Sequence, residues 1–391
     1  MKDWPNKVWN LEDWEFIEKH LKEDPVALQL KYGRDSEKNK ALVSQVARWQ
    51  KLHKKFPKIP FTKGWILPPE LSIEQASSSE TAAYKAHWMS NKNVVDVTGG
   101  MGMDAMEISQ VSKSYTHIES VLEISLSAQS LLRDKALCIC GDSSEILPQL
   151  ETEYNVSKTD VLYADPARRD DKGNKVISWE MLTPNPLEQL PLWLQTAPEV
   201  WIRLTPMTDI LEIEKSLTNV SVLHIMGKGR EAKEITAVCK REPSPLKIQI
   251  STDSNPDHIW ELAFSEVNQP PRKISSPKKY LYDPHSTVMI SRAWNWICEE
   301  FDLFALDTKT RLFTSDQLIT NFPGRVFEIH EIHPSLPKGL KGRKLAIATQ
   351  NHPVKAADLK KKLKAKESDS EFLWATQSQG KYIYLLASKY R

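Results

Sequence analysis

The stretch VVDVTGGMGMDAM, residues 94–106, decides the fold of this 391-residue chain. An apolar run typical of a buried strand ends in three glycines within four positions, Gly99, Gly100 and Gly102. Glycine permits backbone conformations and close approaches that a Cβ excludes. The pattern predicts a strand, a tight turn and a helix, with the turn at the carboxyl end of a parallel sheet, where main-chain N–H groups can contact a ligand. A purely structural tight turn is the alternative.

After Glu74 the sequence alternates between strand and helix signals. Apolar strand signals stand at residues 93–98, 114–120, 135–140, 160–165, 199–205, 220–226 and 234–240. Amphipathic helical stretches lie between most of them, which predicts a mostly parallel sheet with right-handed crossovers. The last two strands flank GKGREA, 227–232, and predict an antiparallel hairpin at the sheet edge. Two more strand signals, 245–251 and 259–266, either extend this sheet or begin a connector.

Different patterns precede and follow this sheet. The first 75 residues have helical periodicity over 10–23 and 36–55, each beginning at a capping residue, Asn10 or Ser36. A linker rich in proline and lysine, 268–279, leads to a segment with both helix and strand signals, including helices at 287–301 and 355–366. We predict an N-terminal helical domain, a central α/β domain and a small C-terminal α/β domain, with bounds 1–73, 74–268 and 269–391.

The composition is that of an ordinary globular protein, with 40% hydrophobic and 27% charged residues. The longest apolar runs are too short to span a bilayer, and the N-terminus has no apolar signal segment. Four cysteines match neither a disulfide framework nor a zinc signature, and ten histidines have no metal-ligand spacing. We therefore predict a cytoplasmic protein with no membrane partner and no bound metal.

Charge is unevenly distributed along the chain, although its formal net value is only +2. Residues 271–391 contain 21 Lys and Arg against 12 Asp and Glu, a local charge of +9. Residues 1–270 contain 32 Lys and Arg against 39 Asp and Glu, a local charge of −7. A basic end on an acidic body is typical of a protein with a polyanionic partner, and a solvated lysine-rich surface explains the charge equally well.

Acidic residues stand at or just beyond the ends of successive predicted strands. Asp96 lies three residues before the first glycine, Glu119 ends the second strand, and Asp142 follows the third. Because the carboxyl ends of parallel strands meet at one edge of a sheet, these carboxylates are expected to face one ligand. Taken alone, Asp142 is equally well explained as a helix cap.

A dinucleotide cofactor is an alternative occupant of this edge. The spacing of Gly100, Gly102 and Ala105 fits a dinucleotide-binding turn, and Glu119 is placed to accept from ribose hydroxyls. NAD assigns no role, however, to the motif YADPARR, 163–169, after the fourth strand.

In this chain order the motifs resemble those of class I S-adenosylmethionine-dependent methyltransferases. The match is closer to a bacterial group with a THUMP-like C-terminal domain, through the phrases EQASSSETAAYKA, DVTGGMGMDAM, YADPARRDDKGN, LTPMTDI, GREAKEI, YLYDPHS, LFTSDQLITNFPGRVFEI and DLKKKLK. The resemblance implies a Rossmann-like, seven-stranded sheet, mostly parallel with an antiparallel edge strand, and S-adenosylmethionine as cofactor. It implies a cofactor site formed by Asp96, Thr98, Gly99, Gly100, Gly102, Asp104, Glu119 and Asp142.

The motif after the fourth strand departs from the family's pattern. Amine-methylating relatives usually have Asp-Pro-Pro-aromatic, in which the carboxylate and the proline carbonyl hold the amine and the ring stacks on the base. Here Asp165 and Pro166 are retained, and Ala167 and Arg168 follow. We predict that Asp165 and the Pro166 carbonyl orient the methyl acceptor, and that Arg168 and Arg169 contact the acceptor or its phosphates. Salt bridges of these arginines with nearby acidic residues are the alternative.

The THUMP-like domain implies structured RNA, rRNA or tRNA, as the partner and methyl acceptor. We expect Lys360, Lys361 and Lys364, on the predicted helix 355–366, to contact phosphates. Gln350 and His352 stand where a more basic, aromatic sequence is expected. Two alternatives stay open: a methyltransferase acting on protein or a small molecule, and a catalytically silent RNA-binding protein. The oligomeric state and the methylated atom are not predicted.

Overall fold

The computed structural model describes residues 9–33, 36–168 and 179–390, so the predicted site residue Arg169 lies outside the described residues. The chain divides into two compact units. One comprises Met1–Ser221, Glu234–Ser244 and Ser254–Pro256, and the other comprises Val222–Lys233, Pro245–Asp253 and Asp257–Arg391. The domain bounds expected from the sequence stay predictions, and each unit is described by itself.

Helices form the N-terminal part of the first unit. They are α1 (Leu11–His20), α2 (Pro25–Tyr32), α3 (Glu37–Lys55), α4 (Glu70–Gln75) and α5 (Ser79–Trp88). Asn10 caps α1 and Ser36 caps α3, as predicted, whereas α2 was not expected. Their buried core, with Trp49 and Trp65 fully enclosed, also takes in Met101 and Met103. These helices therefore pack against the glycine turn.

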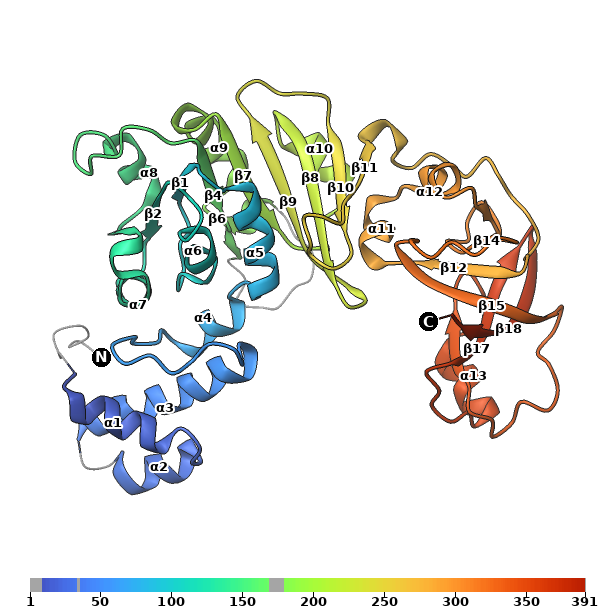
Figure 1. Ribbon diagram of the computed structural model, residues 1–391, viewed down its shortest axis with the longest axis horizontal. Helices are drawn as coiled ribbons and strands as arrows, with labels where there is room; N and C mark the ends of the chain where they lie inside the picture. The colour runs from blue at the N-terminus through green and yellow to red at the C-terminus, as the bar shows by residue number, and fades with distance from the viewer. Residues whose placement is uncertain (1–8, 34–35, 169–178, 391) are drawn as a thin grey trace. The chain divides into compact units, whose positions relative to one another are not determined.

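The rest of the first unit contains six strands of a mostly parallel sheet and the helices between them (Figure 1). Its strands are β1 (Asn93–Asp96), β2 (Ser114–Glu119), β3 (Leu137–Cys140), β4 (Val161–Ala164), β7 (Glu199–Leu204) and β9 (Glu231–Lys240). Its helices are α6 (Met103–Ile108), α7 (Leu122–Leu132), α8 (Ser143–Ile146), α9 (Pro186–Thr196) and α10 (Ile210–Ser216). The strands β7, β4, β1, β2 and β3 are parallel neighbours, and β9 runs antiparallel to β7.

The complete sheet has nine strands in the order β11-β10-β8-β9-β7-β4-β1-β2-β3. The predicted mostly parallel sheet is confirmed, with two differences. It has nine strands, not seven, because β10 (Lys247–Ser251) and β11 (Trp260–Ala263) extend it beyond β8 (Val220–Lys228). The strand order places β9 inside the sheet, and the antiparallel edge strand is β11. The chain order reverses between β1 and β4, which is the switch point where open α/β sheets bind ligands.

The second unit contains a seven-stranded sheet in the order β13-β14-β12-β15-β18-β17-β16. Its strands are β12 (Tyr280–Pro284), β13 (Phe304–Ala305), β14 (Phe313–Ser315), β15 (Gly324–His333), β16 (Ala346–Thr349), β17 (Glu371–Ser378) and β18 (Lys381–Lys389). Its helices are α11 (Ser286–Ser291), α12 (Trp294–Glu300) and α13 (Ala356–Leu363). The single helix expected over 287–301 is two helices, because Arg292 adopts a left-handed conformation and ends α11.

Candidate cofactor and acceptor site

Three glycines form the turn between β1 and α6, and they are needed for different reasons. Gly100 and Gly102 have φ angles of 56° and 87°, which residues with a Cβ rarely adopt. A Cβ on Gly99 would lie 2.2 Å from Nε2 of His117, so an imidazole fills the space expected there for a ligand. Among the described residues, a Cβ on Gly100 would meet only the Thr98 carbonyl oxygen, at 3.8 Å. The main chain is therefore open at Gly100 and closed at Gly99.

The side chain of His117 packs against the glycine turn. Its imidazole is fully buried, and Nε2 lies 3.1 Å from the carbonyl oxygen of Gly100. Burial lowers the pKa of His117 to about 4, so the ring is neutral at physiological pH. A carbonyl can only accept, so Nε2 is the protonated nitrogen. A neutral histidine thus fixes the conformation of the open glycine.

The carboxylates predicted after β2 and β3 lie at the same edge as the turn. Oε2 of Glu119 accepts from the Gly100 N–H at 2.9 Å, and Oε1 accepts from the Val121 N–H at 2.8 Å. The main-chain N–H of Gly141 donates to the Glu119 carbonyl at 3.0 Å, which places Asp142 directly beside it. Three segments distant in sequence are thereby joined.

Asp142 also has the capping role that was the alternative explanation. Its Oδ1 accepts from the Ser144 hydroxyl at 2.6 Å and from the Ser144 N–H at 2.8 Å at the start of α8. These bonds, the hydroxyl first, lower the pKa of Asp142 below its ordinary value. Among the described residues, Oδ2 has no hydrogen-bond partner. One oxygen thus caps the helix, and the exposed second oxygen is free to face a ligand.

Asp96 is buried beneath the turn, and its contacts are all with protein groups. It accepts from the Tyr115 hydroxyl at 2.8 Å and from the Thr98 N–H at 3.0 Å. Burial raises the pKa of Asp96 to about 7 despite these bonds. Of the two partners considered from the sequence, the turn or a cationic ligand, Asp96 reaches the turn.

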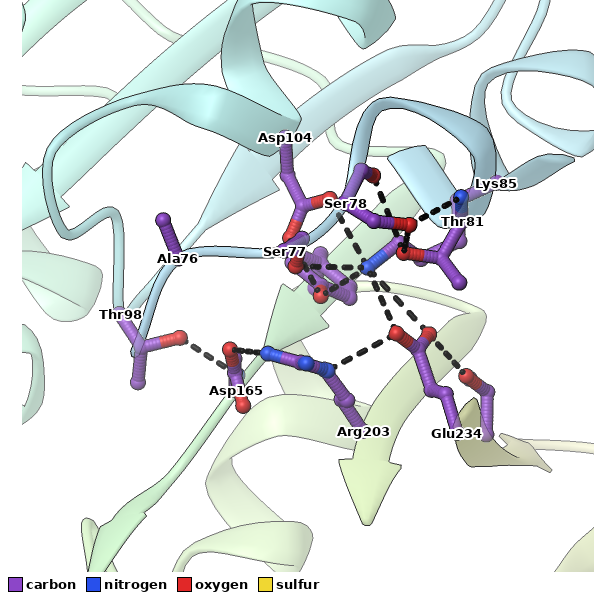
Figure 2. A network of polar contacts seen from close by, with 12 residues as sticks. Ala76, Ser77, Ser78, Thr81, Lys85, Thr98, Asp104, Asp165, Arg203 and Glu234 are labelled. Carbon is purple, nitrogen blue, oxygen red and sulfur yellow. Dashed lines mark hydrogen bonds and ion pairs between the residues drawn. The ribbon is translucent and has the colours of Figure 1, made fainter. Parts of the chain in front are cut away.

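A buried ion cluster joins residues of α5, α6 and β9 (Figure 2). Lys85 of α5, which is fully buried, pairs with Asp104 at 2.9 Å and with Glu234 of β9 at 3.3 Å. Asp104 also accepts from the Ser77 hydroxyl at 2.7 Å and the Tyr163 hydroxyl at 3.0 Å. Both oxygens of Asp104, expected at the cofactor, are therefore engaged by protein groups.

The acceptor motif after β4 is joined to both the turn and this cluster. The Asp165 N–H donates to Oγ1 of Thr98, and its Oδ2 accepts from Nη1 of Arg203 on β7. Arg203 also pairs with Glu234 through Nε at 2.9 Å. Pro166 is buried, and the main chain of Arg168 pairs with Leu182 in the short strand pair of β5 (Ala167–Arg168) with β6 (Leu182–Thr183).

Three residues of the cluster, Lys85, Arg203 and Glu234, were not expected in the site. Each stood in a noted stretch, ETAAYKA, EVWIRLT or GREAKEI, without a role. Arg203 and Glu234 carried a usable signal, because a charged residue inside a buried strand needs a partner of opposite charge. The partner itself was not predictable, since these strands are distant in sequence.

Apolar side chains are exposed near two of the strand ends. Val121 and Leu122, directly after Glu119, are about half exposed, and Met207 in the segment after β7 is 75% exposed. Exposed apolar surface beside polar site residues is typical of ligand-binding edges. A cavity of about 440 Å³ lies elsewhere, at the amino-terminal ends of β1, β2 and β3, where Asn93, Ser114 and Leu137 line it.

The expected phosphate-binding lysines lie on and just after α13. Lys360 pairs with Glu367, while Lys361 and Lys364 are exposed. The loop 338–344 joins the end of this helix, because Gly342 donates to the Leu363 carbonyl at 2.8 Å and Lys366 donates to the Arg343 carbonyl at 2.9 Å. We call the exposed cations of these two segments the loop–helix surface: Lys338, Lys341, Arg343, Lys344, Lys361, Lys362, Lys364 and Lys366.

Gln350 and His352, which departed from the expected basic pattern, have structural contacts. Oε1 of Gln350 accepts from the Arg311 N–H at 2.7 Å. The His352 ring lies 5.1 Å from the rings of both Tyr382 and Tyr384. In the part of the chain that the structure describes, no three His, Cys, Asp or Glu residues are grouped to hold a metal ion. No described helix is both long and apolar enough to cross a membrane.

Two family models match the second unit. A ferredoxin-like domain matches residues 280–323, and a THUMP domain-like model matches residues 324–389. The predicted THUMP-like C-terminal domain is thereby confirmed. No curated protein matches the chain.

One solved structure shares the fold of nearly the whole chain. The crystal structure of a "putative methyltransferase" from Porphyromonas gingivalis W83 is similar, with a TM-score of 0.86 and 24% identity over 97% of this chain and 98% of that chain. This establishes a common fold along nearly the whole length. An rRNA methylase from Streptococcus thermophilus is a partial likeness (TM-score 0.29, 14% identity, 41% of this chain and 93% of that chain). A tRNA (m1A58) methyltransferase from Aquifex aeolicus is also a partial likeness (TM-score 0.30, 13% identity, 44% of this chain and 71% of that chain). These two decide nothing about function.

Proposed function

We propose that the protein is an S-adenosylmethionine-dependent methyltransferase that acts on structured RNA, rRNA or tRNA. One observation supports this most directly. The open glycine turn, Glu119, Asp142 and Asp165 lie together at the carboxyl edge of the sheet, next to the switch point between β1 and β4. The shared fold with the protein from Porphyromonas gingivalis and the THUMP-like domain agree with it.

The groups at this edge fit the proposed cofactor. Gly100 leaves the main chain open, since among the described residues the nearest atom to its Cβ position is the Thr98 carbonyl oxygen at 3.8 Å. Oε1 of Glu119 accepts from the Val121 N–H and, at 3.4 Å, from the Ser120 hydroxyl, whereas Oε2 accepts only the Gly100 N–H among the described residues and keeps a second lone pair for a ribose hydroxyl. Asp142 has Oδ2 for an adenine amino group, and Val121 and Leu122 offer apolar surface for the purine.

When bound, S-adenosylmethionine supplies a sulfonium methyl group: its C–S bond breaks, the electron pair stays on sulfur, and a new bond joins the methyl carbon to the acceptor. The chain needs to align the acceptor and take up the released proton. We assign both tasks to the Asp165 carboxylate and the Pro166 carbonyl, which can accept hydrogen bonds from the methyl acceptor. Positioning of this kind lowers a barrier by about 7–11 kcal/mol.

RNA is proposed as the substrate because the loop–helix surface adds a second basic segment to α13. Eight exposed cations on a loop and the adjoining helix match a phosphate backbone better than the helix alone. The four cysteines are free, in keeping with the proposed cytoplasmic location.

Calorimetry with S-adenosylmethionine, S-adenosylhomocysteine and NAD tests the cofactor. Binding of NAD without the sulfonium ligand would contradict the proposal. Transfer of a tritiated methyl group to total cellular RNA, and not to total protein, tests the substrate. Label in protein alone would favour the protein methyltransferase, and cofactor binding with no transfer to any acceptor would favour a silent RNA-binding protein.

A further inference from the structure

Arg203 joins two carboxylates that come from different elements. Its Nε pairs with Oε2 of Glu234 on β9 at 2.9 Å, and its Nη1 donates to Oδ2 of Asp165 after β4. The guanidinium is planar, so fixing one edge fixes the direction of the other donors. The orientation of Arg203 at Glu234 thus determines where it holds Asp165.

Glu234 is itself rigidly held. Its side chain is fully buried, pairs with Lys85 at 3.3 Å and accepts from the Thr236 hydroxyl at 3.1 Å. A buried carboxylate with two cations and a hydroxyl around it has no room to change rotamer without losing charge compensation. The guanidinium of Arg203 is therefore anchored through Nε at Glu234 and directs Nη1 toward Asp165.

Asp165 is left with one free oxygen. Its main-chain N–H donates to Thr98, and its Oδ2 accepts from Arg203. Among the described residues Oδ1 has no hydrogen-bond partner, and the side chain is 34% exposed. The carboxylate is thus held on one side and open on the other.

We propose that Arg203 is a positioning residue for methyl transfer, which holds Oδ2 of Asp165 so that Oδ1 alone receives one N–H or O–H of the methyl acceptor. The inference rests on the proposed function. Arg203 acts through Asp165 and does not itself contact the acceptor. Lysine cannot replace it, because one ammonium on a flexible stem does not hold two carboxylates in a fixed relative orientation.

A double-mutant cycle tests this. Arg203→Lys and Arg203→Met are made in the wild type and in an Asp165→Asn background, and methylation of cellular RNA is followed as kcat and KM. We expect each Arg203 variant to lower kcat by at least about 100-fold in the wild type, but by less than about 3-fold in the Asp165→Asn background, since residues that act as a unit are non-additive. Calorimetry should show cofactor affinity within a few-fold of wild type.

Arg241→Met is the matched control. Arg241 donates to the carbonyl oxygens of Leu194 and Gln195 and has no contact with the cluster, so kcat should stay unchanged. If Arg203→Met does not fold, the double-mutant cycle is measured with Arg203→Lys, because this variant keeps a cation beside Glu234. Equal losses in both backgrounds, or full activity of Arg203→Lys, would overturn this inference while leaving the proposed function intact. A wild-type protein that binds cofactor and methylates no RNA would overturn the proposed function.

Discussion

The main-chain N–H of Gly100 donates to Oε2 of Glu119 across 2.9 Å. This bond ties the turn after β1 to the acidic residue that ends β2, and Gly100 makes it with a left-handed φ of 56°. Among the described residues, no atom lies closer than 3.8 Å to the place where its Cβ would be. The conformation of the turn and the placement of the Glu119 carboxylate therefore both involve Gly100, where we propose that the cofactor approaches the main chain.

Replacing Gly100 with alanine should affect both stability and cofactor binding. A Cβ at this φ costs about 1–2 kcal/mol of unfolding free energy and would occupy the open space at the turn. Urea denaturation and calorimetry with S-adenosylhomocysteine measure the two effects. Gly339→Ala is the control, because Gly339 has a φ of 80° and no atom within 4 Å among the described residues of its loop. It should lower stability similarly and leave affinity unchanged; unaltered affinity in Gly100→Ala would count against this site.

The pKa of Asp96, raised to about 7 by burial, should make stability depend on pH. The folded state binds this proton more tightly than the unfolded state, so the contribution of Asp96 to stability is greatest below about pH 4 and falls as pH rises to 7. The slope is at most about 1.4 kcal/mol per pH unit. Asp96→Asn has no such proton to lose. The stability of this variant relative to the wild type should therefore rise between pH 4 and 7. Urea denaturation across pH 4–8 measures it, and a constant difference between the two proteins would contradict it.

Removing the buried cation Lys85 should destabilise the fold strongly. Lys85→Met leaves Asp104 and Glu234 as buried carboxylates short of a partner, which costs about 3–5 kcal/mol. Lys92→Met is the control, because Lys92 pairs with Glu199 where both side chains stay partly exposed, and its loss should cost at most about 1 kcal/mol. Similar values for the two variants in chemical denaturation would contradict the prediction.

The Lys85→Met deficit should also shrink in acid. Burial acts to raise the pKa of Asp104, but Lys85 and Arg203 outweigh it and hold the pKa below its ordinary value. The stabilisation from this lowered pKa is present above the ordinary value of 3.8 and is lost as pH falls through the folded pKa. The wild type thus loses stability towards pH 3, and the variant loses less.

The loop–helix surface should contribute to RNA binding through charge alone. Replacing Arg343 and Lys344, or Lys361 and Lys364, with glutamine should weaken binding at low salt and reduce the slope of log K against log salt by about 1 for each lost phosphate contact. Filter binding over a range of salt concentrations measures the slope. The control replaces Lys19 and Lys22, two exposed residues of the first unit, with glutamine, and should leave the salt slope unchanged. An unchanged slope would exclude this surface from the interface.

Several site features were predictable because they depend on local sequence. The glycine turn and the carboxylates Glu119 and Asp142 follow from strand ends in chain order, and parallel strands bring such ends to one edge. The capping of α1 and α3 by Asn10 and Ser36 was predictable for the same reason, since a cap contacts residues two or three positions away.

Other features depend on contacts that no local pattern encodes. Gly99 looked like an opening for a ligand and is filled by His117 from the neighbouring strand. Asp104 looked like a cofactor contact and faces Lys85. The helix expected over 287–301 has a helical pattern throughout, yet it breaks at Arg292, where α11 ends.

The sequence by itself determined the mostly parallel sheet, its glycine turn and the acidic strand ends, because periodicity and backbone preference act over a few residues. Only the tertiary structure decided that Lys85, Arg203 and Glu234 form one buried cluster behind Asp165. Charges can stay in an apolar interior only when opposite charges from distant segments meet them there, and that meeting is fixed by the packing of strands and helices.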